Sequence, residues 1–196
     1  MKVIGITGGV GSGKSMILGL LKEMCSCRVI VTDEEAAKLR EPGGALYTEM
    51  VYLLGDECVA ADGSFIRERA AQKIFTDKVL LKKVNKLIHP AVKKVVLDEI
   101  EKERELNQID YLFVESALLL SDGYDEICDE IWYIFVREEV RRKRLKASRG
   151  YTDEKITIIL NNQKKDEALK DKCKWVIDNS DDANLTRQQI ALILNK

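Results

Sequence analysis

Five short apolar runs along the chain have the pattern of buried β-strands. Each is nearly continuous in apolar residues rather than alternating, which is typical of strands covered on both faces in a parallel sheet. The runs are Val3–Ile6, Arg28–Val31, Tyr111–Glu115, Ile131–Val136 and Trp175–Asp178. Helical patterns separate them, so we predict an α/β fold with a five-stranded parallel sheet. Ligands of such folds bind at the carboxyl ends of the strands.

The segment of about residues 41–110 breaks this alternation and is predicted to be a helical insertion. A turn cluster, Glu41–Gly44, opens it, and the first helix carries four apolar residues on one face: Leu46, Met50, Leu53 and Leu54. A turn at Asp62-Gly63 precedes a long helical pattern over about residues 77–106. Pro90 is expected to kink or divide this helix. An insertion of this size is a natural place for substrate recognition.

Between the first strand and the next helical pattern lies Gly8–Ser15, which fits the phosphate-loop motif G-x-x-x-x-G-K-[ST]. The inner face of the following helix is predicted to comprise Ile17, Leu18, Leu20, Leu21 and Met24. A strand, a glycine-rich turn and a helix N-terminus together make an anion site of inward-pointing N–H groups. Lys14 would reach the outer phosphates of a nucleotide, and the hydroxyl of Ser15 would ligate magnesium.

Asp33 directly follows the second strand, whose end is expected near the phosphate loop. Its carboxylate would then face the terminal phosphate and accept a proton from an attacking hydroxyl. The alternative is that Asp33 caps a helix starting near Glu34. Thr32 with Glu35 also has a capping-box pattern.

A basic cluster follows the fourth strand: six of the nine residues from Arg141 to Arg149 are Lys or Arg and none is acidic. Arginines there would clamp phosphates and stabilise charge in a transition state. The alternative is a solvated helix face. The glycine in Arg149-Gly150 predicts a turn, so residues of about 138–165 would form a helical hairpin that closes as a lid.

Composition narrows the class of protein. The 196 residues, 45% of them hydrophobic, are enough for one core and one domain, and the net charge of −1 gives no general reason to expect nucleic-acid or membrane partners. The phosphate loop starts too early for a signal peptide to precede it.

Five cysteines, with Cys25 and Cys27 too close for zinc-finger spacing, are expected to be reduced, mostly buried thiols of a cytoplasmic protein. A single histidine, His89, argues against a histidine-rich metal site.

Motifs of other nucleotide-binding classes are absent from the sequence. Neither D-x-x-G nor N-K-x-D occurs, which argues against a GTPase, and there is no ABC-transporter signature. A small phosphate-loop kinase acting on a small molecule is the interpretation that remains.

These motifs, in this order, resemble the dephospho-CoA kinase family over nearly the whole chain. The similar segments are Ile6–Ser15, Thr32-Asp33, Glu41–Gly43, Asp62-Gly63 with Arg67, Phe75, Asn85 to Pro90, Arg144 to Arg149, Gln163 and Val176–Ser180. The resemblance implies a three-layer P-loop kinase fold with a helical insertion and a lid. It implies transfer of the γ-phosphoryl group of ATP to the ribose 3′-hydroxyl of dephospho-CoA, with Mg²⁺ as cofactor. No nucleic acid, membrane or obligate protein partner is expected.

The resemblance also assigns roles to residues. Lys14 would neutralise phosphate charge, Ser15 would hold magnesium, Asp33 would orient or deprotonate the acceptor hydroxyl and Arg144 would act from the lid. The expected ATP-binding residues are Gly9, Gly11, Ser12, Gly13, Lys14, Ser15, Met16, Arg149 and Asn179, with Asn179 near the adenine. The expected acceptor-binding residues are Asp33, Arg67 and His89.

Three positions depart from the family's pattern. Val31 stands where an aspartate is common, Met16 stands where threonine is common, and Ala117–Ser121 replaces a proline-leucine-leucine segment ending in glutamate. We expect Val31 to face the core and activity to survive. Two alternatives stay open: a kinase for a nucleoside, nucleotide or shikimate-like acceptor, and a nucleotide-binding regulatory protein that transfers no phosphate.

Overall fold

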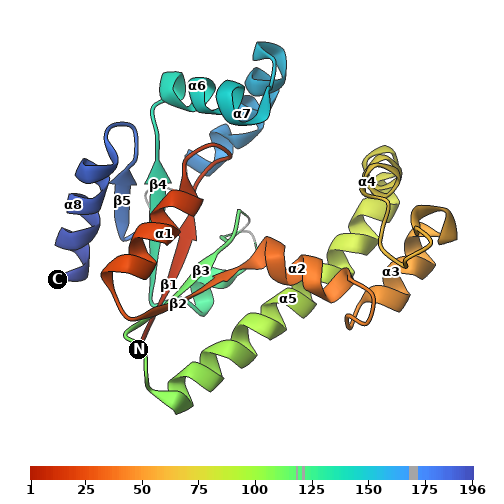
Figure 1. Ribbon diagram of the computed structural model, residues 1–196, viewed down its shortest axis with the longest axis horizontal. Helices are drawn as coiled ribbons and strands as arrows, with labels where there is room; N and C mark the ends of the chain where they lie inside the picture. Colours follow the sequence, from red (N-terminus) through yellow and green to blue (C-terminus); the bar gives the residue numbers. More distant parts are fainter. Residues whose placement is uncertain (118, 121, 168–171) are drawn as a thin grey trace. The chain divides into compact units, whose positions relative to one another are not determined.

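A five-stranded sheet organises the part of the chain that carries the glycine-rich loop. The computed structural model describes residues 1–117, 119–120, 122–167 and 172–196, and for residues 162–167 it describes the helical backbone only. The strands are β1 (Lys2–Thr7), β2 (Cys27–Val31), β3 (Tyr111–Glu115), β4 (Glu130–Phe135) and β5 (Trp175–Asp178), in the order β2-β3-β1-β4-β5 (Figure 1). β1 pairs parallel with β3 and β4, and β4 pairs parallel with β5. The α/β class and the parallel sheet are confirmed.

The chain forms two compact units. Unit 1 comprises Met1–Ile30 and Ile100–Lys196, and unit 2 comprises Val31–Glu99. The helices of unit 1 are α1 (Lys14–Met24), the short 3₁₀ helix η2 (Tyr124–Glu126), α6 (Glu138–Arg149), α7 (Asp153–Glu167) and α8 (Ala183–Leu194). Those of unit 2 are α2 (Thr32–Arg40), α3 (Tyr47–Leu54), the 3₁₀ helix η1 (Asp56–Cys58) and α4 (Arg67–Thr76). Helix α5 (Lys78–Leu106) begins in unit 2 and ends in unit 1.

The core of unit 1 is built on the apolar strands. Its fully buried side chains include Ile4, Ile6, Leu112, Phe113, Trp132 and Ile134. Helix α1 turns Ile17, Leu18 and Leu21 inward, which confirms most of its predicted inner face, and it contacts α8. Because both faces of the central strands are buried, their near-continuous apolar runs are explained.

Unit 2 has a helical core of its own. Seven buried residues form it, contributed by the segment before α3, by α3 itself, η1, α4 and the first turns of α5: Leu46, Met50, Leu54, Cys58, Ala70, Leu80 and Val84. The predicted apolar face of α3 is therefore confirmed, with Leu53 packed against the cluster. Pro90 was expected to kink or divide the long helix; the division does not occur, since α5 continues through Pro90, and the kink stays a prediction. Proline removes one helical N–H donor, and the bonds and apolar packing on either side hold the helix together.

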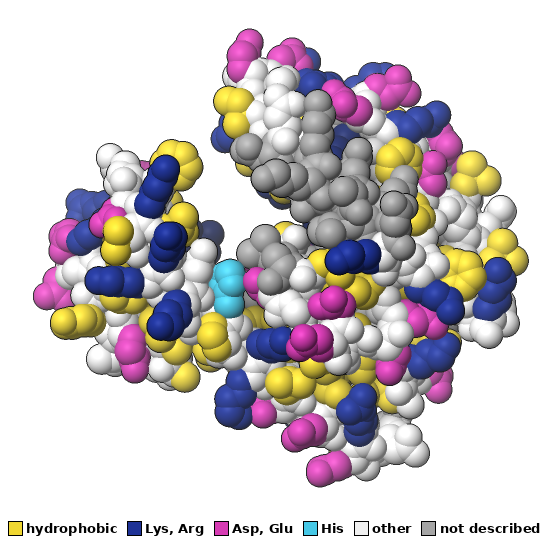
Figure 2. All heavy atoms as spheres, turned by 180° about the vertical axis from the view of Figure 1, so that it is seen from behind, with side chains coloured by type: hydrophobic (Ala, Val, Ile, Leu, Met, Phe, Trp, Pro, Cys, Tyr) yellow, Lys and Arg dark blue, Asp and Glu magenta, His cyan; other side chains and the backbone are white. Residues whose placement is uncertain are grey.

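Acidic, basic and apolar side chains are interspersed on the face of the molecule shown in Figure 2. Such mixing agrees with the net charge of −1. Among the described helices, none combines the length and the apolar character needed to cross a bilayer.

Candidate active site

The glycine-rich loop leaves the carboxyl end of β1, the central strand of the sheet. β1 lies between β3 and β4, so the strand order reverses there, and such a switch point is where open α/β sheets bind ligands. Residues 8–13 form the loop, and α1 begins directly after it at Lys14. The predicted strand, loop and helix are all present.

Two loop glycines leave no free space for a side chain, and one of them also has a left-handed backbone. Gly13 is the residue before α1 and has φ 88°, in the left-handed region that favours glycine. A side chain on Gly13 would also collide with the amide nitrogen of Asn179. At Gly9, a side chain would overlap the guanidinium group of Arg141. Substitution of Gly13 would therefore strain the backbone of the loop, and substitution of Gly9 would displace the guanidinium group of Arg141.

The loop presents hydrogen-bond donors that the protein does not use. Within the described residues, the backbone N–H groups of Gly11, Gly13 and Ser15 donate no hydrogen bond. The hydroxyl of Ser12 is buried and has no partner in the described part of the chain. Buried polar groups are normally paired, so a cluster of unpaired donors at a helix N-terminus fits an anionic ligand.

Lys14 is anchored on both sides of the loop. Its Nζ donates to the carbonyl oxygen of Gly8 at 2.8 Å and forms an ion pair with Oε1 of Glu115 at 3.2 Å. Both side chains are largely buried. Glu115 ends β3, the strand beside β1. Sequence reasoning missed Glu115; the signal was a carboxylate at the carboxyl end of a buried strand, where ligand-binding groups gather.

Two arginines of α6 contact the loop. Arg141 is buried and donates from Nε to the carbonyl oxygen of Val10 at 2.6 Å. Arg144 points at the last loop residue, with Nη1 3.5 Å from the position of a Cβ on Gly13. That Nη1 is buried and has no hydrogen-bond partner among the residues that the structure describes. A buried guanidinium donor aimed at an anion-binding loop is suited to binding phosphate oxygens.

Helices α6 and α7 form the predicted helical pair. Gly150 ends α6 in the left-handed conformation. Leu145, Ile156 and Leu160 form a small apolar cluster, against which Val10 of the loop packs. Arg149 is exposed at the end of α6 and lies over the ring of Tyr151, and their contact lowers the pKa of the Tyr151 phenol. The described contacts of Arg149 therefore lie within the hairpin rather than at the loop.

Asn179, directly after β5, fastens the loop to the edge of the sheet. Its Nδ2 donates to the carbonyl oxygen of Ser12 at 2.8 Å, and its Oδ1 accepts from the Thr186 hydroxyl at 3.2 Å. The side chain is 1% exposed. Both ends of the amide are thus engaged in positioning the loop.

Asp33 lies in the first turn of α2, in unit 2. The preceding Val31 is the residue before the helix, and no side chain makes a capping hydrogen bond there. The capping-box pattern of Thr32 and Glu35 is therefore not formed, and Asp33 is exposed rather than engaged as a cap. Val31, expected in the core, is half-buried.

A pocket of about 570 Å³ lies within unit 2. Its lining is mainly apolar, with Met50, Leu54, Phe65, Ala70, Ala71 and Ile74, and it includes the charged residues Arg40, Glu41 and Arg67. Two residues of α2, Ala37 and Arg40, line this pocket. Asp33 precedes Ala37 by four residues and Arg40 by seven, so the three lie on one face of α2. His89 is half-buried on α5 and is not a lining residue.

Among the described residues around the loop, the Ser15 hydroxyl and the Glu115 carboxylate are candidate oxygen ligands for a divalent cation. Ser15 is exposed in the first turn of α1, and its hydroxyl has no partner in the described part of the chain. No group of three or more His, Cys, Asp or Glu residues that would hold a metal occurs among the described residues. A hydroxyl and a carboxylate suit magnesium, which is commonly bound by one or two protein oxygens together with nucleotide phosphates and water. Ser121 and the side chain of Gln163, singled out from the sequence, lie outside the described residues.

Comparisons with known proteins agree with this geometry. The family model CoaE, dephospho-CoA kinase, matches residues 2–184. A dephospho-CoA kinase of Carboxydothermus hydrogenoformans is 32% identical, over 100% of this chain and 94% of that protein. TT1252 from Thermus thermophilus superposes with a TM-score of 0.82 at 26% identity, covering 99% of this chain and 96% of that one. A shikimate kinase from Bacteroides thetaiotaomicron, 13% identical with a TM-score of 0.60 over 100% and 99% of the two chains, shares the fold alone. With a family match that extends over nearly its whole length, the chain belongs to the dephospho-CoA kinase family.

Proposed function

We propose that this protein transfers the γ-phosphoryl group of ATP to the ribose 3′-hydroxyl of dephospho-CoA, giving CoA and ADP. In this step the acceptor oxygen forms a bond to phosphorus, the bond to the β-phosphate bridging oxygen breaks, and the hydroxyl proton leaves. The observation that carries the proposal is the family match over residues 2–184. The reaction would complete coenzyme A synthesis.

The donor side of the reaction is supported by the loop and α6. The unpaired N–H groups of the loop would hold the phosphates, and phosphate oxygens would compete with Glu115 for Nζ of Lys14. The buried, unpartnered Nη1 of Arg144 would donate to the phosphoryl oxygens. Fixed donors in a water-poor site are worth several kcal/mol of transition-state stabilisation. Arg141 and Asn179 would keep the loop in shape.

Magnesium would be held through oxygens of this chain near Lys14. The hydroxyl of Ser15 is the proposed ligand, and the carboxylate of Glu115 is the acidic group that the structure brings to Lys14. When bound, the ion would neutralise phosphate charge.

The acceptor side is supported by the architecture of unit 2. The pocket of about 570 Å³ offers apolar surface for an extended arm and two arginines, Arg40 and Arg67, for phosphate groups. Asp33, on the same face of α2 as the pocket residue Ala37, would orient the acceptor hydroxyl and accept its proton. His89 would contribute to acceptor binding, Met16 and Arg149 to ATP binding, and Asn179 would lie near the adenine.

Two alternatives remain distinct from this proposal. The shared fold of the shikimate kinase does not select the acceptor, since one fold hosts many functions. A purely regulatory nucleotide-binding protein would have no use for the unpartnered arginine donor beside the loop. We also propose that the enzyme works in the cytoplasm without an obligate protein, nucleic-acid or membrane partner.

One set of parallel incubations distinguishes the proposed kinase from a kinase with another acceptor and from a regulatory nucleotide-binding protein. The protein is mixed with ATP and magnesium and, in parallel reactions, with dephospho-CoA, AMP, a nucleoside or shikimate, and the products are weighed by mass spectrometry. We expect phosphate addition to dephospho-CoA alone. Phosphorylation of another acceptor in its place would favour the second kinase class, and tight ATP binding with no acceptor phosphorylated would favour the regulatory protein.

A further inference from the structure

Two thiols converge on one point where α1 ends. Cys25 Sγ donates to the carbonyl oxygen of Leu21 at 3.2 Å, and Cys27 Sγ donates to the same oxygen at 3.6 Å. The two thiols also interact with each other. The bend at Cys25 and Ser26 lets residues two apart in sequence present their sulfurs side by side. This pair has no part in the proposed phosphoryl transfer.

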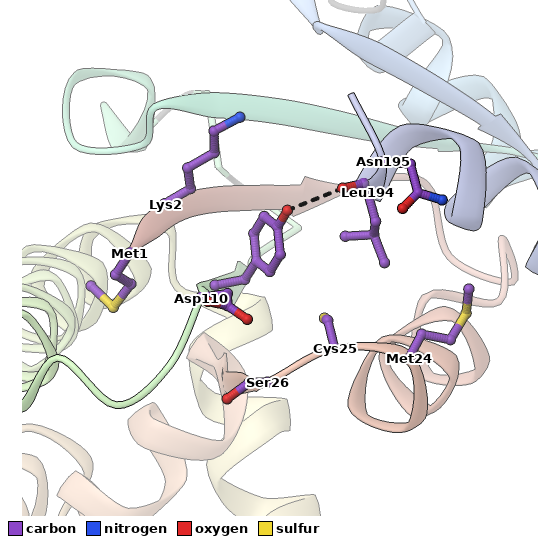
Figure 3. Close-up of a pocket in the computed structure, with 9 residues that line it drawn as sticks. Met1, Lys2, Met24, Cys25, Ser26, Asp110, Leu194 and Asn195 are labelled. Carbon is purple, nitrogen blue, oxygen red and sulfur yellow. Dashed lines mark hydrogen bonds between the residues drawn. The ribbon is translucent and has the colours of Figure 1, made fainter.

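The pair adjoins an open pocket at the amino-terminal edge of the sheet. The pocket has a volume of about 600 Å³, and Cys25 lines it together with Met24, Met1 and Asp110 (Figure 3). Both cysteines are half-buried, contrary to the expectation of mostly buried thiols, since Cys58 alone of the five is buried. The pocket therefore gives a path to the Sγ atom of Cys25.

The thiols can lose their protons without leaving a buried carbonyl unpaired. The oxygen of Leu21 also accepts the backbone N–H of Cys25 at 3.1 Å, a stronger bond than either S–H contact. Burial raises the pKa of Cys25 to about 12, helped by Cys27 and Asp110. Burial also raises the pKa of Cys27, opposed by its contact with Cys25 and by Lys22. Both groups are thus neutral near pH 7, and a bound cation would displace two protons.

The chemical type of the available ligand atoms determines which metal ion this site can bind. Structural zinc takes four ligands, and no group of three His, Cys, Asp or Glu residues suited to a metal occurs among the described residues. Magnesium and calcium prefer oxygen. Soft thiolate and thioether ligands select Cu(I). We propose that Cys25 and Cys27 form a binding site for a soft monovalent cation of the Cu(I) type, in which two S–H bonds are replaced by two S–metal bonds and two protons are released.

The test is a competition titration of the full-length protein with Cu(I), kept reduced under anaerobic conditions, against a coloured Cu(I) chelator. We expect one ion bound per chain and about two protons released, which makes the affinity rise roughly a hundredfold per pH unit around neutrality. Cys25→Ser and Cys27→Ser should each weaken binding at least about tenfold. Cys128→Ser and Cys173→Ser, which change thiols of similar half-burial elsewhere, should leave it unchanged.

A second measurement uses the unmutated chain and so does not depend on the folding of a variant. Cu(I) should protect Cys25 and Cys27, and not Cys173, from alkylation, as mapped by peptide mass spectrometry. The proposal is overturned if the chelator keeps all the Cu(I), or if Cu(I) binding is lost on substitution of another cysteine instead. It is also overturned if Cys25 and Cys27 are alkylated to the same extent with and without the ion. None of these outcomes depends on kinase activity, so the proposed function is unaffected by them.

Discussion

Oε1 of Glu115 lies 3.2 Å from Nζ of Lys14, which ties the end of β3 to the lysine of the glycine-rich loop. Glu115→Gln keeps the size of the side chain and removes its charge. If this carboxylate also serves magnesium, the variant should need several-fold more Mg²⁺ for half-maximal turnover. Activity measured over a magnesium series, with thermal unfolding beside it, checks this. A lowered melting temperature with an unchanged magnesium requirement would restrict Glu115 to holding the loop.

The amide of Asn179 is predicted to stabilise both the fold and the nucleotide site. Asn179→Ala would leave the carbonyl oxygen of Ser12 without its 2.8 Å donor, which costs about 1–3 kcal/mol for a buried group. For a chain of this size, this cost lowers the melting temperature by several degrees, at roughly 2–4 °C per kcal/mol. The KM for ATP should rise as the loop loosens. Asn184→Ala, at an exposed asparagine of α8, is the matched control and should change neither quantity.

Arg144 is expected to act in transfer and to contribute little to folding. Arg144→Gln should lower kcat by about 10²–10³ because a fixed donor to the phosphoryl oxygens is lost. The melting temperature of this variant should hold or rise, because the buried Nη1 has no partner among the described residues whose loss would destabilise the fold. Lys143→Gln, which changes an exposed basic residue of the same helix, is the control and should keep its turnover. An unchanged kcat in Arg144→Gln would exclude a role of Arg144 in phosphoryl transfer.

Asp33 is predicted to act on the acceptor hydroxyl. Asp33→Asn should reduce turnover by about 10²-fold or more while the Kd for ATP stays the same, because a general base contributes about 10²–10⁴ to the rate. Steady-state kinetics with ATP binding measured by calorimetry tests both parts. The neighbouring exposed carboxylate gives the control Glu34→Gln, which should behave as the unmodified protein. Near-normal turnover in Asp33→Asn would leave this residue a solvent-exposed carboxylate without a catalytic role.

Much of the fold is predictable from the sequence because it rests on strong local patterns. Each predicted strand lies within one residue of the observed one, since continuous apolar runs between helical patterns leave little choice. Pro90 shows the opposite case. Local chemistry predicts a kink or a division, yet the helix is not divided, because hydrogen bonds and packing along α5 outweigh the loss of one donor.

The candidate site is less predictable, because charged residues at surfaces and at sites look alike in sequence. The motif fixes Lys14 and Ser15, but a run of six basic residues does not tell which of them face the loop. Leu145, the one large apolar residue in that run, marks the inner face of α6, and Arg141 precedes it by one turn. The contact between Asn179 and Ser12 joins residues far apart in sequence, and no local pattern predicts it.

The most direct test of the account is phosphate transfer itself, followed by phosphorus NMR of the product. With ATP, magnesium and dephospho-CoA, the unmodified protein should yield ADP and a product phosphorylated at the ribose 3′-oxygen. Lys14→Ala, which lacks the ammonium group that contacts Gly8 and Glu115, should form almost no phosphorylated product. Phosphate at any other position, or transfer undiminished in Lys14→Ala, would contradict the account.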